Sequence, residues 1–221
     1  MNPNHLNEKL AEAARYALLR RLAPAIRHDM AGALQPISMM AAMLDKRMQK
    51  PAPDLVALSG NSAAISALSR EAAAACMELM TWLAPKDDKP VAVGEGVASC
   101  IGLLITELSF RGFSLVNQTA GIEPKIAKSI LRNVFMAALV ALTDSSDNPA
   151  SLTIAASVDA TADGPWLLLS LQIEKTEGEP SPGAPHAYRP LQWDDVEMLA
   201  LSEQVELTHT PASAQLRCRV S

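Results

Sequence analysis

The chain has 221 residues, 49% of them apolar and 19% charged, and a formal net charge of −5 at pH 7. This length and balance are typical of a soluble globular chain of one or two domains. Basic residues are thinly spread without interleaved aromatics, which argues against nucleic-acid binding. Three widely spaced cysteines indicate neither a disulfide framework nor a metal site, and no apolar run approaches the ~20 residues of a membrane span. We therefore expect a cytoplasmic protein with neither nucleic acid nor membrane as a partner.

The first part of the chain predicts two long helices joined by a short breaker. Apolar residues recur at spacings of three and four in a first helix over about residues 7–49 and in a second that ends near residue 83. The breaker, residues 50–54, holds two prolines, so the helices form an antiparallel hairpin. Because two helices alone bury little core, we expect two hairpins to pair into a four-helix bundle, which means a homodimer.

The second part of the chain predicts a mixed α/β domain. A linker with two prolines and a charge cluster covers residues 84–90. Beyond it, helices are expected over residues 95–110, 123–142 and 193–204, and strands over residues 113–116, 151–158, 166–173, 205–208 and 214–220. The predicted fold class is α+β, with a helical hairpin domain at residues 1–85 and an α/β sandwich domain at residues 91–221.

A histidine followed by an aspartate, His28-Asp29, lies inside the first predicted helix. The apolar seam through Leu34 and Ile37 extends back to Met30, which leaves His28 out of register with the seam and on the solvent side. An exposed imidazole that is largely neutral at cytoplasmic pH is a competent nucleophile. The adjacent carboxylate can hold the ring or accept its proton. The pair is therefore the candidate catalytic site.

The stretch around this pair resembles the H-box of bacterial sensor histidine kinases, where a histidine accepts a phosphoryl group. His28, Asp29, Leu34 and Ile37 match that pattern, whereas Gly32 and Ala33 depart from it. The resemblance implies that His28 is the phosphoryl acceptor and that Asp29 assists it. Gly32 replaces the Asn or Thr that orients water in kinases with phosphatase activity, so we expect no phosphatase activity.

The second domain resembles the GHKL, or Bergerat-type, ATPase-like domain of the same kinases, but its nucleotide motifs are degenerate. The segment at residues 130–138 is similar to the N-box; it keeps Asn133 but has Ala137 where the resemblance implies a magnesium-binding asparagine. A methyl group cannot coordinate a hard cation. The expected Asp-x-Gly-x-Gly turn and glycine-rich lid are missing, and Asp194 and Asp195 would repel a triphosphate. We expect neither an ATP nor a metal cofactor.

The whole arrangement resembles the bacterial histidine phosphotransferases of the ChpT type. The resemblance implies a dimer that passes a phosphoryl group between receiver-domain aspartates through His28, with Mg²⁺ supplied by the receiver. Its partners would be response-regulator receiver domains and, upstream, a hybrid histidine kinase. The receiver-docking surface is expected to contain exposed residues within about two turns of His28, namely Arg20, Arg21, Arg27, Ala31, Gly32 and Gln35.

Two other functions are open on the sequence alone. The first is a non-catalytic pseudokinase adaptor, which would bind a response regulator or a kinase through the same bundle and would tolerate loss of His28. The second is an active kinase with an unusual nucleotide site, which ATP and Mg²⁺ would stabilise against heat.

Overall fold

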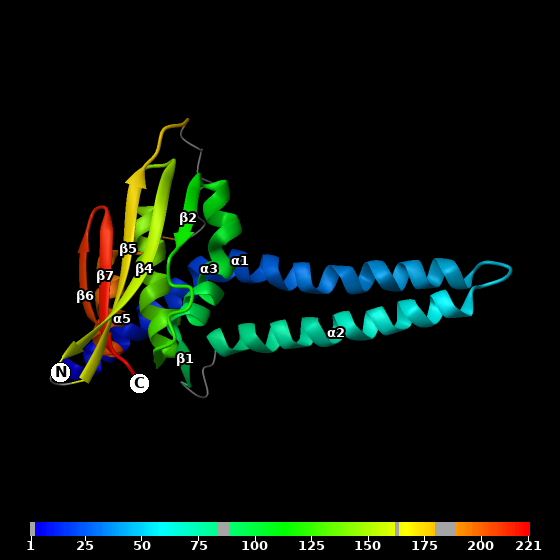
Figure 1. Cartoon of the computed structure of the whole chain (residues 1–221), viewed down its shortest axis with the longest axis horizontal. Helices are drawn as coiled ribbons and strands as arrows, with labels where there is room; N and C mark the ends of the chain where they lie inside the picture. Colours follow the sequence, from blue (N-terminus) through cyan, green and yellow to red (C-terminus); the bar gives the residue numbers. More distant parts are fainter. Residues whose placement is uncertain (1–2, 84–88, 162–163, 180–188) are drawn as a thin grey trace. The chain divides into compact units, whose positions relative to one another are not determined.

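The computed structural model of the chain, shown in Figure 1, describes residues 3–83, 89–161, 164–179 and 189–221. The chain has the α+β class and divides into two compact units. The α/β unit comprises Met1–Leu22 and Asp87–Ser221, and the hairpin unit comprises Ala23–Lys86. Helix α1 (Pro3–Met48) contributes to both units. Residues 3–22 therefore pack with the α/β unit, whereas the sequence-based division placed them with the hairpin.

The hairpin unit consists of the second part of α1 and helix α2 (Leu55–Leu83), which confirms the two predicted helices. Asp54 starts α2, because its carboxylate accepts hydrogen bonds from the backbone N–H groups of Val56 and Ala57 at 3.0 and 3.1 Å. Near the turn, the guanidinium of Arg47 on α1 donates to the side-chain oxygen of Asn61 on α2 at 3.1 Å. These bonds fix the connection between the helices.

The hairpin unit has almost no core of its own. Among its residues whose side chains the structure describes, only Ala25, Asn61 and Ala72 are buried. Large apolar side chains of the expected seam, which runs from Met30 through Leu34 and Ile37 to Met48, remain exposed in the single chain, including Leu34 at 46% and Met48 at 59%. Exposed apolar area of this kind is costly in water and favours association with another apolar surface.

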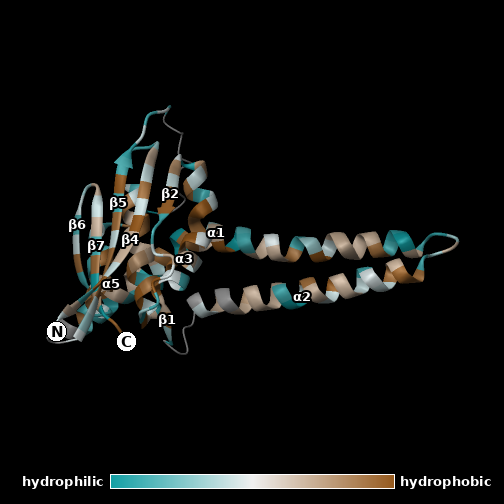
Figure 2. Ribbon diagram, in the orientation of Figure 1, coloured by the Kyte–Doolittle hydropathy of each residue, from teal (hydrophilic) through white to brown (hydrophobic). Residues whose placement is uncertain are grey.

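The α/β unit contains a five-stranded sheet with the strand order β2-β4-β5-β7-β6. Its strands are β2 (Phe113–Asn117), β4 (Ala150–Thr161), β5 (Gly164–Lys175), β6 (Glu206–Thr210) and β7 (Ser213–Arg219). Strands β2 and β4 pair in parallel and the other neighbours pair antiparallel. Side chains on β4, β5 and β7 alternate between buried and partly exposed, so one face of the sheet carries the core. Figure 2 shows the resulting alternation of hydrophobic and polar residues.

A helical layer packs on that face of the sheet. It is formed by α3 (Val93–Phe110), the π-helical turn η1 (Ile130–Phe135), α4 (Met136–Asp144) and α5 (Trp193–Ser202). Helix α4 is the centre of the core, because every residue from Met136 to Leu142 is at most 2% exposed. Leu152, Leu169 and Leu171 of the sheet are buried to a similar degree. Burial of this apolar area supplies the main driving force for folding of the unit.

The structure corrects the sequence-based expectation at one segment. Residues 123–142 were predicted to form one helix. Instead, residues near the start of this segment form strand β3 (Lys125–Ala127), which pairs antiparallel with β1 (Pro90–Ala92). A three-residue strand gives too short a pattern to detect in a sequence. Within the described residues, the other predicted helices and strands are present with small shifts at their ends. Residues 162–163, residues 84–88 of the predicted linker and residues 180–188 lie outside the described residues.

By length and composition, α3 could cross a membrane, with a mean hydropathy of 1.4 over 18 residues. The sequence-based expectation had found no such run. However, 44% of these residues are buried in the α/β unit, and the core helix of a soluble protein meets the same criterion. The apolar character of α3 is accounted for by its buried face, which includes Val97, Ile101, Leu104 and Leu108.

Candidate functional site

His28 lies exposed on α1 in the hairpin unit. Its side chain is 70% exposed, and its Nδ1 lies 3.5 Å from Oδ1 of Asp29, whose side chain is 47% exposed. In the tautomer that carries the proton on Nδ1, this nitrogen donates towards the carboxylate and Nε2 holds the lone pair. The pair therefore presents a nucleophilic nitrogen on an open helix surface, beside a group that can take up a proton.

The helix face around His28 carries small and uncharged side chains. Ala31, Gly32 and Gln35 follow His28 by three, four and seven positions, which places them on the same face one and two turns further along. All three are exposed. A Cβ atom added at Gly32 would meet no atom within 4 Å, so nothing inside the chain requires a glycine there. This face offers no steric barrier to a molecule that approaches His28.

The structure separates the three arginines of the expected docking surface. Arg27 is exposed, one position before His28. Arg20 is exposed on the part of α1 that belongs to the α/β unit, and its guanidinium lies 5.5 Å from the ring centroid of Tyr16. Arg21 is only 4% exposed, so its assignment to an exposed docking surface was wrong. The expected docking residues that lie exposed on the hairpin unit are therefore Arg27, Ala31, Gly32 and Gln35.

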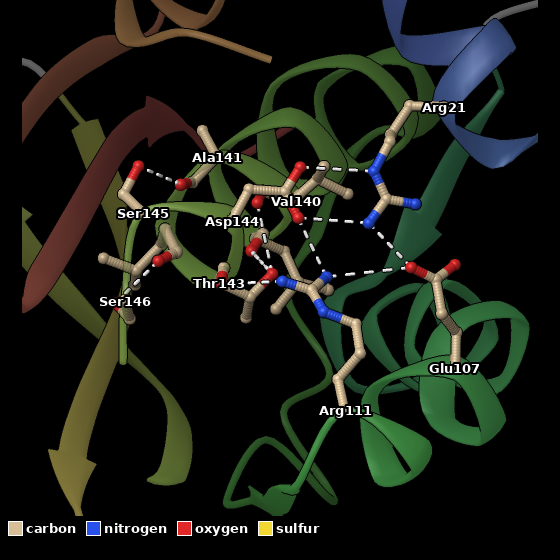
Figure 3. A network of polar contacts seen from close by, with 11 residues as sticks. Arg21, Glu107, Arg111, Val140, Ala141, Thr143, Asp144, Ser145 and Ser146 are labelled. Atoms are coloured by element: carbon tan, nitrogen blue, oxygen red, sulfur yellow. Dashed lines mark hydrogen bonds and ion pairs between the residues drawn. The ribbon is translucent and has the colours of Figure 1, made fainter. Parts of the chain in front are cut away.

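Arg21 instead belongs to a buried ion-pair network in the α/β unit, shown in Figure 3. It donates two hydrogen bonds to Asp144, at 3.1 and 3.2 Å, and lies 2.6 Å from Glu107. Arg111 completes the network, 2.8 Å from Asp144. Burial disfavours the charged guanidinium of Arg21, but the hydrogen bonds to both carboxylates outweigh it, so its pKa is raised. Two positive and two negative groups thus neutralise one another inside the protein.

Asn133, in the segment that resembles the N-box, also makes an internal contact. The amide of Asn133 donates to Oε1 of Glu203 at 2.7 Å, and the hydroxyl of Ser129 donates to Oε2 of the same carboxylate at 2.7 Å. Ala137, at the position of the expected magnesium ligand, is completely buried. Residues 130–135 of the segment that resembles the N-box form the π-helical turn η1, an irregularity often found at functional sites. The segment therefore keeps an unusual backbone, while its polar side chain holds a carboxylate of the same chain.

Asp195 has a structural partner that the sequence did not reveal. Its carboxylate binds Arg189 through two bonds of 2.6 and 2.7 Å and accepts the backbone N–H of Gln192 at 3.0 Å, which caps the start of α5. The hydrogen bond from Arg189 holds the pKa of this carboxyl below its usual range. Of the two carboxylates expected to repel a triphosphate, Asp195 is therefore paired with a cation of the same chain.

No protein-family model and no curated protein matches the chain. It is similar to the catalytic domain of the histidine kinase ThkA, with 6% identity and a TM-score of 0.46, over 61% of this chain and 96% of that one. It is similar to a bacterial phosphotransferase, with 13% identity and a TM-score of 0.37, over 92% and 94% of the chains. ThkA in complex with the response regulator protein TrrA gives 10% identity and a TM-score of 0.41, over 98% and 66%. Likenesses at this level assign no family to the chain.

Proposed function

We propose that the chain is a histidine phosphotransferase of a bacterial two-component phosphorelay, which passes a phosphoryl group between receiver-domain aspartates through His28. The observation that carries this proposal is the exposure of the His28 imidazole on a helix surface with small neighbours at Ala31 and Gly32, with its Nδ1 directed to Asp29. A nucleophile that serves another protein's phospho-aspartate has to be reachable in line with the bond that breaks. The 70% exposure of the His28 side chain supports such an approach.

In the first half of the relay, Nε2 of His28 attacks the phosphorus of an aspartyl phosphate on the donor receiver. The new N–P bond forms as the P–O bond to the aspartate breaks, and the aspartate leaves as a carboxylate with the electron pair. The phosphorylated ring holds its positive charge beside Asp29, which stabilises it or takes up the Nδ1 proton. In the second half, an aspartate of the acceptor receiver attacks the phosphorus, and His28 leaves with its lone pair restored. A Mg²⁺ ion held by the receiver would balance charge on the phosphoryl oxygens.

Receiver docking is proposed for the face formed by Arg27, Ala31, Gly32 and Gln35. These residues lie within two turns of His28 and are exposed. Small side chains at residues 31–32 allow the backbone of a receiver loop to approach α1 closely, while Arg27 supplies a positive charge for an acidic phosphorylation pocket. A response-regulator receiver, free or as part of a hybrid kinase, is the partner that this chemistry favours.

A homodimer is proposed for the hairpin unit. The near absence of buried residues in the single hairpin supports it, as do the exposed seam residues Leu34 and Met48. Pairing two hairpins would cover these side chains in a four-helix bundle of the kind common among helical proteins. Such a bundle is isologous, so each dimer would present two equivalent copies of His28.

Transfer without ATP is proposed because the N-box side chains are unsuited to a nucleotide. Ala137 offers no oxygen ligand, and Asn133 already binds Glu203. The carboxylate of Glu203 at this position would also repel phosphate oxygens. Phosphoryl groups would therefore have to come from another protein.

The relay requires the His28 side chain, whereas the adaptor does not. We expect His28→Ala to abolish phosphoryl transfer from phosphorylated receivers while receiver binding, measured by calorimetry, is retained. An adaptor would bind receivers equally well but would never become labelled, whether or not His28 is present. An active kinase would instead show an increased Tm with ATP and Mg²⁺ and would label itself without a receiver.

A further inference from the structure

The first part of α1 is an integral element of the α/β unit. Ala11, Ala14, Leu18 and Leu22 follow one another at spacings of three and four, so they form one stripe of the helix. Each of them is at most 2% exposed. Leu18 and Leu22 are among the largest completely buried side chains of the chain. This degree of burial shows that the segment is packed into a core and does not simply lie on a surface.

Two arginines on the same segment bind acidic groups of the helical layer. Arg15 donates to the hydroxyl of Ser202 at 2.9 Å and lies 3.5 Å from Glu203 at the end of α5. Arg21 binds Asp144 at the end of α4 and Glu107 of α3. The segment is therefore attached to three helices by charge-assisted bonds in addition to its apolar stripe.

One of these contacts involves the N-box region. Glu203 accepts hydrogen bonds from Asn133 and Ser129 and also faces Arg15. The amide of Asn133 thus orients the carboxylate that receives α1. Asn133 therefore contributes to the packing of α1 by holding Glu203, the carboxylate that binds Arg15. This structural role requires no nucleotide.

We propose that the ATPase-like unit acts as an anchor for the helix that carries His28, with Arg15 and Arg21 as positioning residues for phosphoryl transfer. This inference rests on the proposed function. Helix α1 spans Pro3 to Met48 and contains Pro24, which removes one backbone hydrogen bond between the anchored segment and His28. The turns beyond Pro24 still extend an existing helix and need no new nucleus, so order at the start of α1 limits fraying of the turns that carry His28. A receiver then docks onto a helix that is already ordered, so binding loses less conformational entropy.

The test compares Arg15→Gln and Arg21→Lys with the matched control Glu12→Gln, which removes an exposed charge from the same segment. Lysine keeps the charge of Arg21 but cannot form its forked bonds to Asp144 and Glu107. Hydrogen exchange of the full chain is followed by mass spectrometry over residues 3–22, and kcat/KM for transfer from a phosphorylated receiver is measured on the same proteins. Circular dichroism verifies that each variant is folded.

We expect backbone exchange over residues 3–22 to rise several-fold in Arg15→Gln and more than tenfold in Arg21→Lys, with kcat/KM falling in the same order. Glu12→Gln should match the wild type in both measurements. Unchanged exchange would refute the anchor, and increased exchange with unchanged kcat/KM would refute the positioning role. Because exchange is read without any receiver, the anchor can be judged even if no receiver transfers a phosphoryl group to His28, an outcome that would count against the proposed function itself.

Discussion

Arg21 and Asp144 are 123 positions apart in the sequence and are joined by two hydrogen bonds between guanidinium and carboxylate. This bond ties the helix that leads to His28 to the end of α4 in the α/β unit. Glu107 and Arg111 share the same network, so its charges balance. An arginine that looks like a surface residue in the sequence is thereby a structural element of the interior.

Replacement of Arg21 by methionine should destabilise the protein strongly. The substitution keeps an unbranched side chain of similar length, but Arg111 is then the single arginine beside the buried Asp144 and the half-buried Glu107. Removal of one partner from a buried ion-pair network costs about 3–5 kcal/mol. Urea unfolding measures this loss. Arg27→Met, which removes an exposed arginine from the same helix, should change the free energy of unfolding by no more than about 0.5 kcal/mol; equal losses in both variants would show that the network is not stabilising.

Replacement of Gly32 by methionine should separate docking from folding. Apart from the adjoining residues and backbone of its own helix, a Cβ at Gly32 or at Gly60 in α2 would meet no atom within 4 Å, so both sites can accept a side chain. Each substitution should stabilise its helix by up to about 1 kcal/mol, because glycine is a poor helix former. Only Gly32→Met should reduce kcat/KM with a phosphorylated receiver, by about tenfold, which is 1.36 kcal/mol of transition-state stabilisation. The same transfer rate in both variants would remove Gly32 from the docking surface.

The contribution of Asp195 to the free energy of unfolding should depend on pH. Arg189 lowers the pKa of this carboxyl in the folded protein, so the unfolded chain binds the proton at a higher pH than the folded one. The stabilisation is therefore complete above the unfolded pKa of about 3.9 and is lost as the pH falls through the lower folded value. Asp195→Asn should lower the Tm at pH 7, by an amount equivalent to about 1 kcal/mol. Thermal unfolding at several pH values should show this difference shrinking below about pH 4, and a difference that grows in acid would contradict the assignment.

A charge placed on the expected dimer seam should dissociate the hairpins. Leu34 and Met39 are both exposed in the single chain, at 46% and 65%, but only Leu34 belongs to the predicted seam. Leu34→Glu should give a monomer in sedimentation velocity at micromolar concentration, whereas Met39→Glu should sediment like the wild type. A wild-type protein that sediments as a monomer would refute the four-helix bundle.

The hairpin was predictable because its apolar period is sustained over two long segments around one double-proline breaker. The alternation in β4 and β5 was also strong enough to place both strands. By contrast, the stripe of Ala11, Ala14, Leu18 and Leu22 has the same period as the hairpin seam. The sequence therefore could not show that this first stretch packs into the other unit.

Ion-pair partners were the part of the site that sequence reasoning missed. Arg21 resembled its neighbour Arg20, because nothing local distinguishes a buried arginine from an exposed one. Its carboxylate partners Glu107 and Asp144 come from distant helices and become neighbours only in the folded unit. The bond between Asn133 and Glu203 was hidden for the same reason. The adjacent pair His28 and Asp29, which needs no tertiary contact, was visible at once.

The most direct test of the relay is to incubate the full chain with a panel of receiver domains carrying radiolabelled phospho-aspartate, and to follow the label in the wild type and in His28→Ala. We predict rapid, acid-labile labelling of the wild type that maps to His28, no labelling of His28→Ala, and none of either protein with ATP and Mg²⁺ alone. Labelling from ATP alone, or a wild type that no phosphorylated receiver labels, would contradict the account.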